Sequence, residues 1–77
     1  ELALVKMKNI PVHRSVIMKI LEAYQVKIIE ENQDIIIIAL ADTTARVDSF
    51  EDMLEKYGVL EIVRSGKLVM TKGKKST

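Results

Sequence analysis

A two-layer α+β fold, with helices packed on one face of an antiparallel sheet, is predicted by three features of this 77-residue sequence. Apolar residues first alternate with a period of two and then recur at helical spacing, and this change of period occurs twice along the chain. Residues 35–40 open with four isoleucines, whose stiff χ1 angles favour a strand over a helix. Gly58 follows the second helical pattern and can adopt the positive φ that ends a helix.

The first part of the chain predicts a strand followed by a helix. Residues 2–8 form a strand in which Ala3, Val5 and Met7 point to one fully apolar face. Pro11 ends this strand, because proline is tolerated at a helix start but not in a central strand. The amphipathic helix that follows has an inner face made of Val16, Ile17, Ile20, Leu21 and Tyr24.

The next two strands are predicted to form a hairpin. Residues 26–31 read as the second strand, and residues 31–34 supply the Asn and Asp that suit a tight turn. Residues 35–40 form the third strand, and their continuous apolar run indicates a central strand covered on both faces. Residues 42–44 then offer N-cap side chains for a second helix.

The last part of the chain predicts a helix, a strand and a turn. An apolar stripe on the second helix, with Met53 at its edge, consists of Val47, Phe50, Leu54 and Tyr57. Residues 59–64 form the fourth strand, which is apolar on both faces apart from Glu61 and Arg64. Residues 65–66 form a two-residue turn that leads to a possible short edge strand at residues 68–70.

The order of these elements is β-α-β-β-α-β, the split βαβ arrangement of ferredoxin-like folds. Right-handed crossovers place both helices on one face of the sheet and leave the other face open. We expect residues 1–71 to form this domain and residues 72–77 to form a flexible basic tail.

The open face of such a sheet should be polar in a domain that works alone, but here it carries large apolar side chains. We therefore expect another copy of the chain or another domain to cover it, or alternatively the edge strand at residues 68–70. Charged contacts beside the turn are expected to add to this interface. The interface residues expected are Leu2, Leu4, Ile36, Ile38, Val59, Val63, Arg64 and Lys67.

Composition and charge favour a soluble globular module. Hydrophobic residues make up 48% of the chain, charged residues 30%, and the net charge is +1. The sequence has no cysteine, which removes disulfides and thiolate metal sites and fits a reducing compartment. Its apolar runs are too short to span a bilayer. We expect a cytoplasmic protein, or an organellar one in a eukaryote, and the start at Glu1 without Met suggests a domain of a longer protein.

The sequence shows no constellation of catalytic, metal-binding or cofactor-binding residues. His13 is the only histidine, and it lacks the further nitrogen, sulfur or carboxylate ligands that a metal site needs. The aromatic residues Tyr24, Phe50 and Tyr57 fall on helices or their ends, so base stacking on the sheet is not expected. Nucleic acid is therefore not expected as a partner.

One string resembles a known family. The string is Tyr57-Gly58-Val59-Leu60-Glu61-Ile62-Val63-Arg64-Ser65-Gly66-Lys67. Together with residues 1–6, 14–15, 27–28 and 70–73, it resembles the C-terminal domain of the small regulatory subunit of acetolactate synthase (acetohydroxyacid synthase). The glycine, the paired hydrophobic residues around Glu61 and the Arg-Ser-Gly-Lys end are the specific part, whereas the remainder indicates only a ferredoxin-like pattern.

The resemblance implies a non-catalytic subunit that activates a catalytic partner and makes it sensitive to feedback inhibition, typically by valine, in branched-chain amino-acid synthesis. It implies that thiamine diphosphate, magnesium and FAD belong to the catalytic subunit. It also implies that valine is bound by an N-terminal ACT domain, whose glycine-containing ligand loop has no match in this chain. The alternative is a stand-alone ferredoxin-like module for ligand sensing or nucleic-acid-associated oligomerisation.

Overall fold

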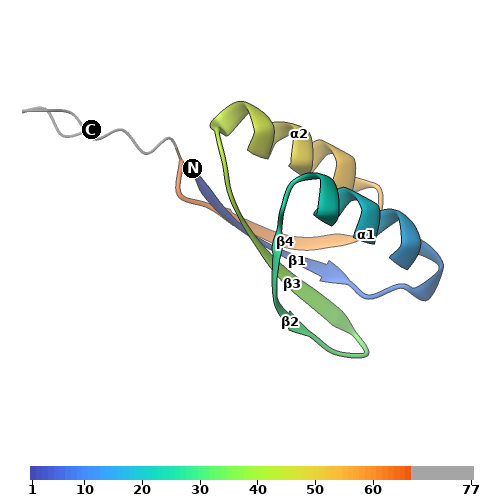
Figure 1. Cartoon of the computed structure of the whole chain (residues 1–77). Helices are drawn as coiled ribbons and strands as arrows, with labels where there is room; N and C mark the ends of the chain where they lie inside the picture. The colour runs from blue at the N-terminus through green and yellow to red at the C-terminus, as the bar shows by residue number, and fades with distance from the viewer. Residues whose placement is uncertain (67–77) are drawn as a thin grey trace, which may run out of the picture.

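The computed structural model describes residues 1–66, which form an antiparallel sheet with two helices on one side (Figure 1). The elements in chain order are β1 (Leu2–Lys8), the 3-10 turn η1 (Pro11–His13), α1 (Arg14–Ala23), β2 (Lys27–Glu31), β3 (Ile35–Ala41), α2 (Thr44–Glu55) and β4 (Val59–Arg64). The predicted ferredoxin-like α+β arrangement is confirmed. The expected edge strand, basic tail and domain boundary at residue 71 lie outside the described residues.

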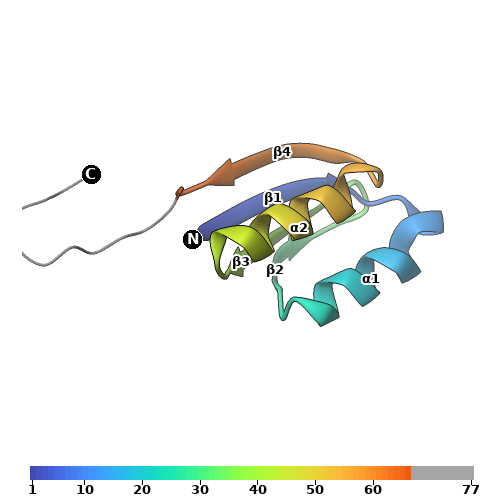
Figure 2. The same ribbon diagram turned by 90° about the horizontal axis from the view of Figure 1, so that it is seen from above.

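The four strands lie in the order β2-β3-β1-β4, and every neighbouring pair is antiparallel. The isoleucine-rich strand β3 is central, as predicted. Figure 2 shows both helices over the same face of the sheet, with α1 nearer to β2 and α2 nearer to β4. The opposite face is not covered by any helix among residues 1–66.

The hydrophobic core lies between the helices and the sheet. Val5 on β1 is paired with Ile38 of β3 on one side and with Ile62 of β4 on the other. The ring of Phe50 packs against the ring of Tyr24, with centroids 5.1 Å apart, and so joins the two helices. The buried apolar residues are Ala3, Val5, Met7, Ile17, Leu21, Ile36, Ile38, Leu40, Val47, Phe50 and Leu54.

Within residues 1–66, β3 is covered on one face only, which differs from the prediction that both its faces are covered. Ile36, Ile38 and Leu40 are buried against the helices, whereas Ile35 and Ile37 are half-buried on the other face. Because successive side chains of a strand point to opposite faces, a run of isoleucines places apolar side chains on both faces of the sheet. Within residues 1–66, one half of the run is buried beneath the helices, and the other half stays partly exposed.

The ends of the helices follow from local chemistry. The Thr43 hydroxyl caps α2 by accepting a hydrogen bond from the Arg46 N–H at 3.2 Å. After α2, Gly58 has φ +93°, and a Cβ placed there would lie 3.4 Å from the Cβ of Lys8, so a glycine is needed. The carbonyl of Gly58 accepts a hydrogen bond from the Lys8 N–H at 2.9 Å. The predicted helix stop therefore also docks β4 onto β1.

Val16 departs from its predicted place on the inner face of α1. It is exposed, while Ile17 and Leu21 are the residues that α1 buries. Neighbouring helical residues point about 100° apart, so a helix that aims Ile17 at the sheet turns Val16 towards solvent. The inner face predicted from the sequence was therefore one residue too wide.

We predict that Ile38→Val lowers the free energy of unfolding by about 1 kcal/mol, because losing one buried methylene costs roughly 0.5–1.5 kcal/mol. The neighbouring change Ile37→Val should cost clearly less, since Ile37 points away from the helices. Both substitutions keep a β-branched side chain, so strand propensity is matched. Urea unfolding followed by circular dichroism at low chain concentration measures both, and equal losses would contradict the assignment of the two faces.

Candidate functional site

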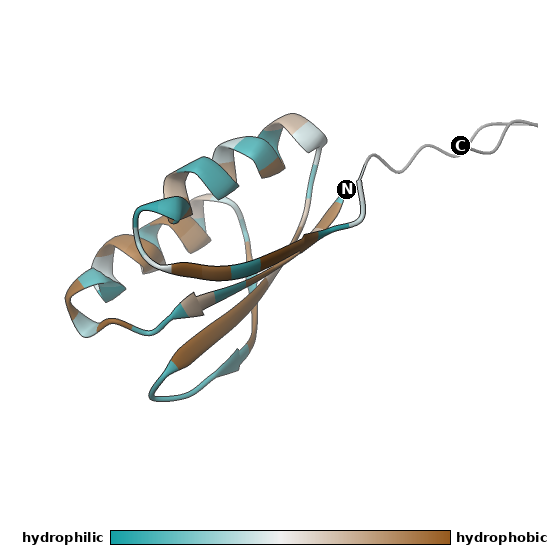
Figure 3. Cartoon of the chain, turned by 180° about the vertical axis from the view of Figure 1, so that it is seen from behind, coloured by the Kyte–Doolittle hydropathy of each residue, from teal (hydrophilic) through white to brown (hydrophobic). Residues whose placement is uncertain are grey.

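The face of the sheet that points away from the helices is the main candidate for function. We call it the open face, and its central residues are Leu2, Leu4, Lys6, Ile35, Ile37, Ala39, Glu61 and Val63. The exposed fractions are 46% for Leu2, 40% for Leu4 and 56% for Val63, which is high for aliphatic side chains on a sheet. Figure 3 shows hydrophobic residues along much of the strands, whereas the helices alternate between hydrophobic and hydrophilic.

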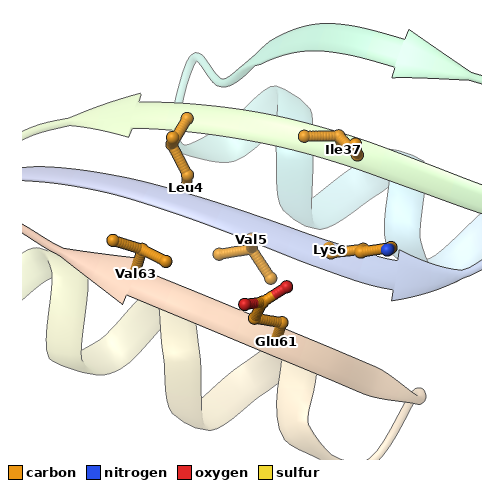
Figure 4. Close-up of a pocket in the computed structure, with 6 residues that line it drawn as sticks. All are labelled: Leu4, Val5, Lys6, Ile37, Glu61 and Val63. Carbon is orange, nitrogen blue, oxygen red and sulfur yellow. The ribbon is translucent and has the colours of Figure 1, made fainter.

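A shallow hollow of about 250 Å³ lies on this face, over β1 and its two neighbouring strands. Leu4, Lys6, Ile37, Glu61 and Val63 surround it, and the helices lie behind the strands in this view (Figure 4). In the pairing of β1 with β4, Leu4 is opposite Val63 and Lys6 is opposite Glu61. An apolar pair and a pair of opposite charges are therefore next to each other at the centre of the face. Such a surface is better suited to contact with another protein than to catalysis.

Three of the predicted interface residues lie on the open face, and three do not. Leu2, Leu4 and Val63 are on it and exposed. The placement of Ile36 and Ile38 was wrong, because both have 0% exposure beneath the helices. Val59 was also misplaced, and it is half-buried against the core. The open-face residues of β3 are instead Ile35, Ile37 and Ala39, which the expected interface set did not include.

A β-bulge explains the misplacement of Val59. Lys6 is paired with Glu61, but the next residue of β1, Met7, is paired with Val59, so Leu60 is an extra residue on β4. One extra residue reverses the alternation of the strand and sends Val59 to the core face. A sequence gives no direct signal for such a bulge, because Val59, Leu60 and Val63 are all suitable for either face.

Arg64 is surrounded by three carboxylates, which the sequence analysis did not foresee. Its Nε and Nη2 donate to the two carboxylate oxygens of Glu1 at 2.7 and 2.8 Å, a bidentate pair. Its Nη1 donates to Asp48 at 2.7 Å and to Glu51 at 3.0 Å. The guanidinium thus joins the start of β1, the end of β4 and the first turns of α2. We call these four residues the Arg64 cluster.

Burial and charge pairing change the pKa values in the Arg64 cluster. The side chain of Glu1 is only 2% exposed. Hydrogen bonds from the Arg64 guanidinium lower the pKa of the Glu1 carboxyl from 4.5 to about 2, against the opposing effect of desolvation. The same pairing raises the pKa of Arg64. The expected contact of Arg64 with a partner stays a prediction, as does that of Lys67, which lies outside the described residues.

Candidates for other kinds of site are weak in the part of the chain that the structure describes. No group of three or more His, Asp or Glu side chains within residues 1–66 is arranged to hold a metal ion. His13 packs edge-on against Tyr57, with ring centroids 5.2 Å apart, and its buried Nδ1 has no hydrogen-bond partner within residues 1–66. The helices of this part are too short and too polar to cross a membrane.

Comparison with known proteins places these features in a family. The family model described as "Small subunit of acetolactate synthase" matches residues 1–73. The chain is 29% identical to the "Probable acetolactate synthase small subunit" of Archaeoglobus fulgidus, over 97% of the chain and 47% of that protein. It is 27% identical to the "Acetolactate synthase small subunit" of Bacillus subtilis, over 95% of the chain and 42% of that protein.

A plant protein is similar as well. The chain is 30% identical to the "Acetolactate synthase small subunit 2, chloroplastic" of Arabidopsis thaliana, over 96% of the chain and 16% of that protein. The chain therefore spans less than half the length of each of these curated relatives.

We predict that Glu1→Gln lowers stability near neutral pH and that the loss disappears in acid. The folded pKa of Glu1, about 2, lies below its ordinary value, so its contribution is present above about pH 5 and is lost as the pH falls towards 2. The gap in urea midpoint between the parent chain and Glu1→Gln should therefore close over that range. The control Glu22→Gln removes an exposed carboxylate of α1 that makes no ion pair within residues 1–66. A gap that stays constant with pH would contradict the role of the Arg64 cluster.

Proposed function

The chain belongs to the family of the small subunit of acetolactate synthase, and from this premise we propose that it is a non-catalytic module that docks through its open face and helps activate a catalytic subunit. The family membership supports the regulatory role. The exposed apolar side chains of the open face are the single observation that supports a docking role for these residues.

The energetics of the open face favour its burial in an assembly. Fully burying one aliphatic side chain is worth about 1.5–3 kcal/mol, and a domain of this size has little stability in reserve. Leu2, Leu4 and Val63 are about half exposed, so each has part of that free energy still to gain. Contiguous apolar surface of this kind is typical of interaction sites. The partners that we propose are a second copy of the chain and the catalytic subunit.

The finer regulatory role is also part of the proposal. Thiamine diphosphate, magnesium and FAD would be held by the catalytic subunit, and valine by an N-terminal ACT domain of the small subunit. Feedback inhibition would then be a coupling free energy between the valine site and the catalytic site, transmitted by repacking of interfaces that include the open face. We propose a cytoplasmic location, or an organellar one in a eukaryote, as the chloroplastic relative has.

The alternative of a nucleic-acid-associated or ligand-sensing module has no supporting feature among residues 1–66. Base-stacking modules of this fold class present aromatic side chains on the sheet. Here the ring of Tyr24 packs at a tilt against the ring of Phe50, and Tyr57 packs against His13. The open face offers aliphatic and charged groups in place of aromatic ones.

We predict that Val63→Asp abolishes activation of the catalytic subunit at ordinary concentrations of the small subunit. A carboxylate buried at an interface without a partner costs several kcal/mol, so half-maximal activation should need at least about a hundredfold more small subunit. The measurement is acetolactate formation by the reconstituted enzyme as the small subunit is titrated. Val63 is more than half exposed, so the variant should fold, which circular dichroism checks.

The matched control is Val12→Asp, the same change at a valine that is 79% exposed on η1, at the helix side of the molecule. It should shift half-maximal activation by no more than about twofold, since exposed substitutions away from special features change little. Equal effects of the two substitutions would argue against the open face as the docking surface.

We also predict that valine does not bind to the 77-residue chain alone. Among residues 1–66 the hollow on the open face is shallow, whereas small-molecule sites are concave pockets that bury most of the ligand, so Lys6 and Glu61 at its border are not sufficient to hold an amino-acid zwitterion. Isothermal titration calorimetry with the chain should give no binding heat at millimolar valine, whereas the complete small subunit should bind. Saturable binding to the chain alone would place an effector site here and overturn this part of the proposal.

A further inference from the structure

We propose that the outer edge of β4, with the acidic side of α2 above it, binds an extended segment of another polypeptide in which lysine or arginine alternates with apolar residues. The segment pairs with β4 as an added strand, and its cationic side chains face the carboxylates of α2. This edge is distinct from the open face, and its use as a binding surface goes beyond the proposed function without resting on it.

The outer edge of β4 has no strand beside it among residues 1–66, because β4 is the last strand in the order β2-β3-β1-β4. The Ser65 N–H donates to the Leu2 carbonyl, so the backbone of Ser65 faces β1. In an antiparallel ladder alternate residues face the neighbouring strand, which turns the N–H and C=O groups of Arg64 and Ile62 outward. A row of outward-facing backbone groups is a template for an added strand.

The other edge of the sheet, at β2, is poorly suited to an added strand. β2 has five residues, and a bulge falls between Ile28 and Glu30, in the middle of the strand. Bulges of this kind protect sheet edges from pairing. On β4 the bulge lies at Leu60, near the start of the strand, and leaves residues 61–64 in regular pairing with β1. β4 therefore offers the longer uninterrupted edge.

The charges above this edge indicate what kind of strand fits it. Figure 2 shows β4 at the margin of the sheet, to one side of α2. The side of α2 that faces β4 carries Asp48 and Glu51, which both bind Arg64. Glu55 follows Glu51 by four residues, about one helical turn, so it lies on the same side of α2. Glu55 is exposed and forms no ion pair within residues 1–66.

Arg64 does not balance the carboxylates around it. Its guanidinium is shared by Glu1, Asp48 and Glu51, and the side chain of Asp48 remains 60% exposed. The surplus of negative charge favours a partner with cations. The spacing fits a strand, because Glu51 and Glu55 are separated by a rise of about 6 Å along the helix and alternate residues of a strand are about 6.6 Å apart.

Apolar residues belong at the alternate positions of the added strand. Successive strand side chains point to opposite faces, so those that do not face α2 lie beside Val63, which is 56% exposed on the open face. On the helix side, the aliphatic stem of a lysine or arginine covers Ile62, which is only half-buried against the core. An acidic strand would meet like charges instead, and an uncharged one would gain nothing from the carboxylates of α2.

The test uses a short peptide, blocked at both ends, that alternates lysine with valine, added at low salt to the isotope-labelled 77-residue chain. Amide hydrogen exchange is followed by NMR. In the free chain the amides of Ile62 and Arg64 should exchange faster than that of Val63, which faces β1. The peptide should slow exchange at Ile62 and Arg64. Protection of both amides in the free chain would show that the edge is already occupied, and would overturn the inference.

Two control peptides separate charge from strand pairing. The same peptide with glutamate in place of lysine should not bind, because its side chains would be repelled by the carboxylates of α2. A peptide of the same composition with its lysines grouped at one end keeps the charge and loses the alternation, so it should bind about fivefold more weakly. Equal binding of the grouped and alternating peptides would indicate a general attraction for cations and would overturn the added strand.

A matched pair of variants tests the side of α2. Glu55→Lys reverses the exposed charge above β4 and should weaken binding of the alternating peptide about three- to tenfold. Lysine is favourable near a helix C-terminus, so this variant should fold. Glu22→Lys makes the same change at an exposed position of α1, nearer to β2 (Figure 2), and should leave binding unchanged. Equal effects of the two variants would contradict the placement of the peptide.

The two proposals are tested separately. None of the peptide measurements depends on activation of the catalytic subunit, and Val63→Asp with its control tests the open face without any peptide. Failure of the added strand at β4 is therefore distinguishable from failure of the proposed function.

Discussion

The structure depends on the two ladders that β1 forms, one with β3 and one with β4. Because side chains in a strand alternate, these two registers decide the face of almost every strand residue at once. Val5 shares the helix-covered face with Ile38 and Ile62, and Lys6, one residue later, shares the open face with Ile37 and Glu61. The core and the candidate site are therefore two results of a single pairing. A slip of one residue in β1 would bury the charges and expose the core.

The Arg64 cluster secures these ladders at the end where β1 begins and β4 finishes. There the Ser65 N–H donates to the Leu2 carbonyl, the Leu2 N–H donates to the Ser65 hydroxyl oxygen, and the Arg64 guanidinium binds Glu1 next to them. Asp48 and Glu51 extend the contact to α2, which covers the core on this side. Asp48 and Glu51, two of the four acidic residues of α2, thus have a structural partner. A planar fork with five N–H donors suits this role, and the single ammonium of a lysine does not.

The sequence was sufficient for the architecture but not for the faces of all the strands. The order of elements, the inner residues Ala3, Val5 and Met7, and the helix stop at Gly58 all follow from periodicity and local chemistry. The face on which Ile36 and Ile38 lie does not follow in this way, because four consecutive isoleucines show no alternation of apolar and polar residues. The face of Val59 could not be predicted either, because it depends on the bulge in β4. The partners of Arg64 could not be predicted from local sequence, since Glu1 is 63 residues away in the chain and is brought close only by the fold.

A non-catalytic role agrees with the physical character of the open face, because a small sheet domain with one uncovered face has its folding and its association linked. Any partner that binds the folded state and not the unfolded chain stabilises it by mass action. A face whose apolar centre is flanked by Lys6 and Glu61 gains stability from contact while restricting which contacts are tolerated. An effector that changed the populations of such contacts would change the partner's activity without touching its chemistry, since coupling between sites needs only a difference in binding free energy between two states. The open face offers apolar surface and a pair of opposite charges to such contacts.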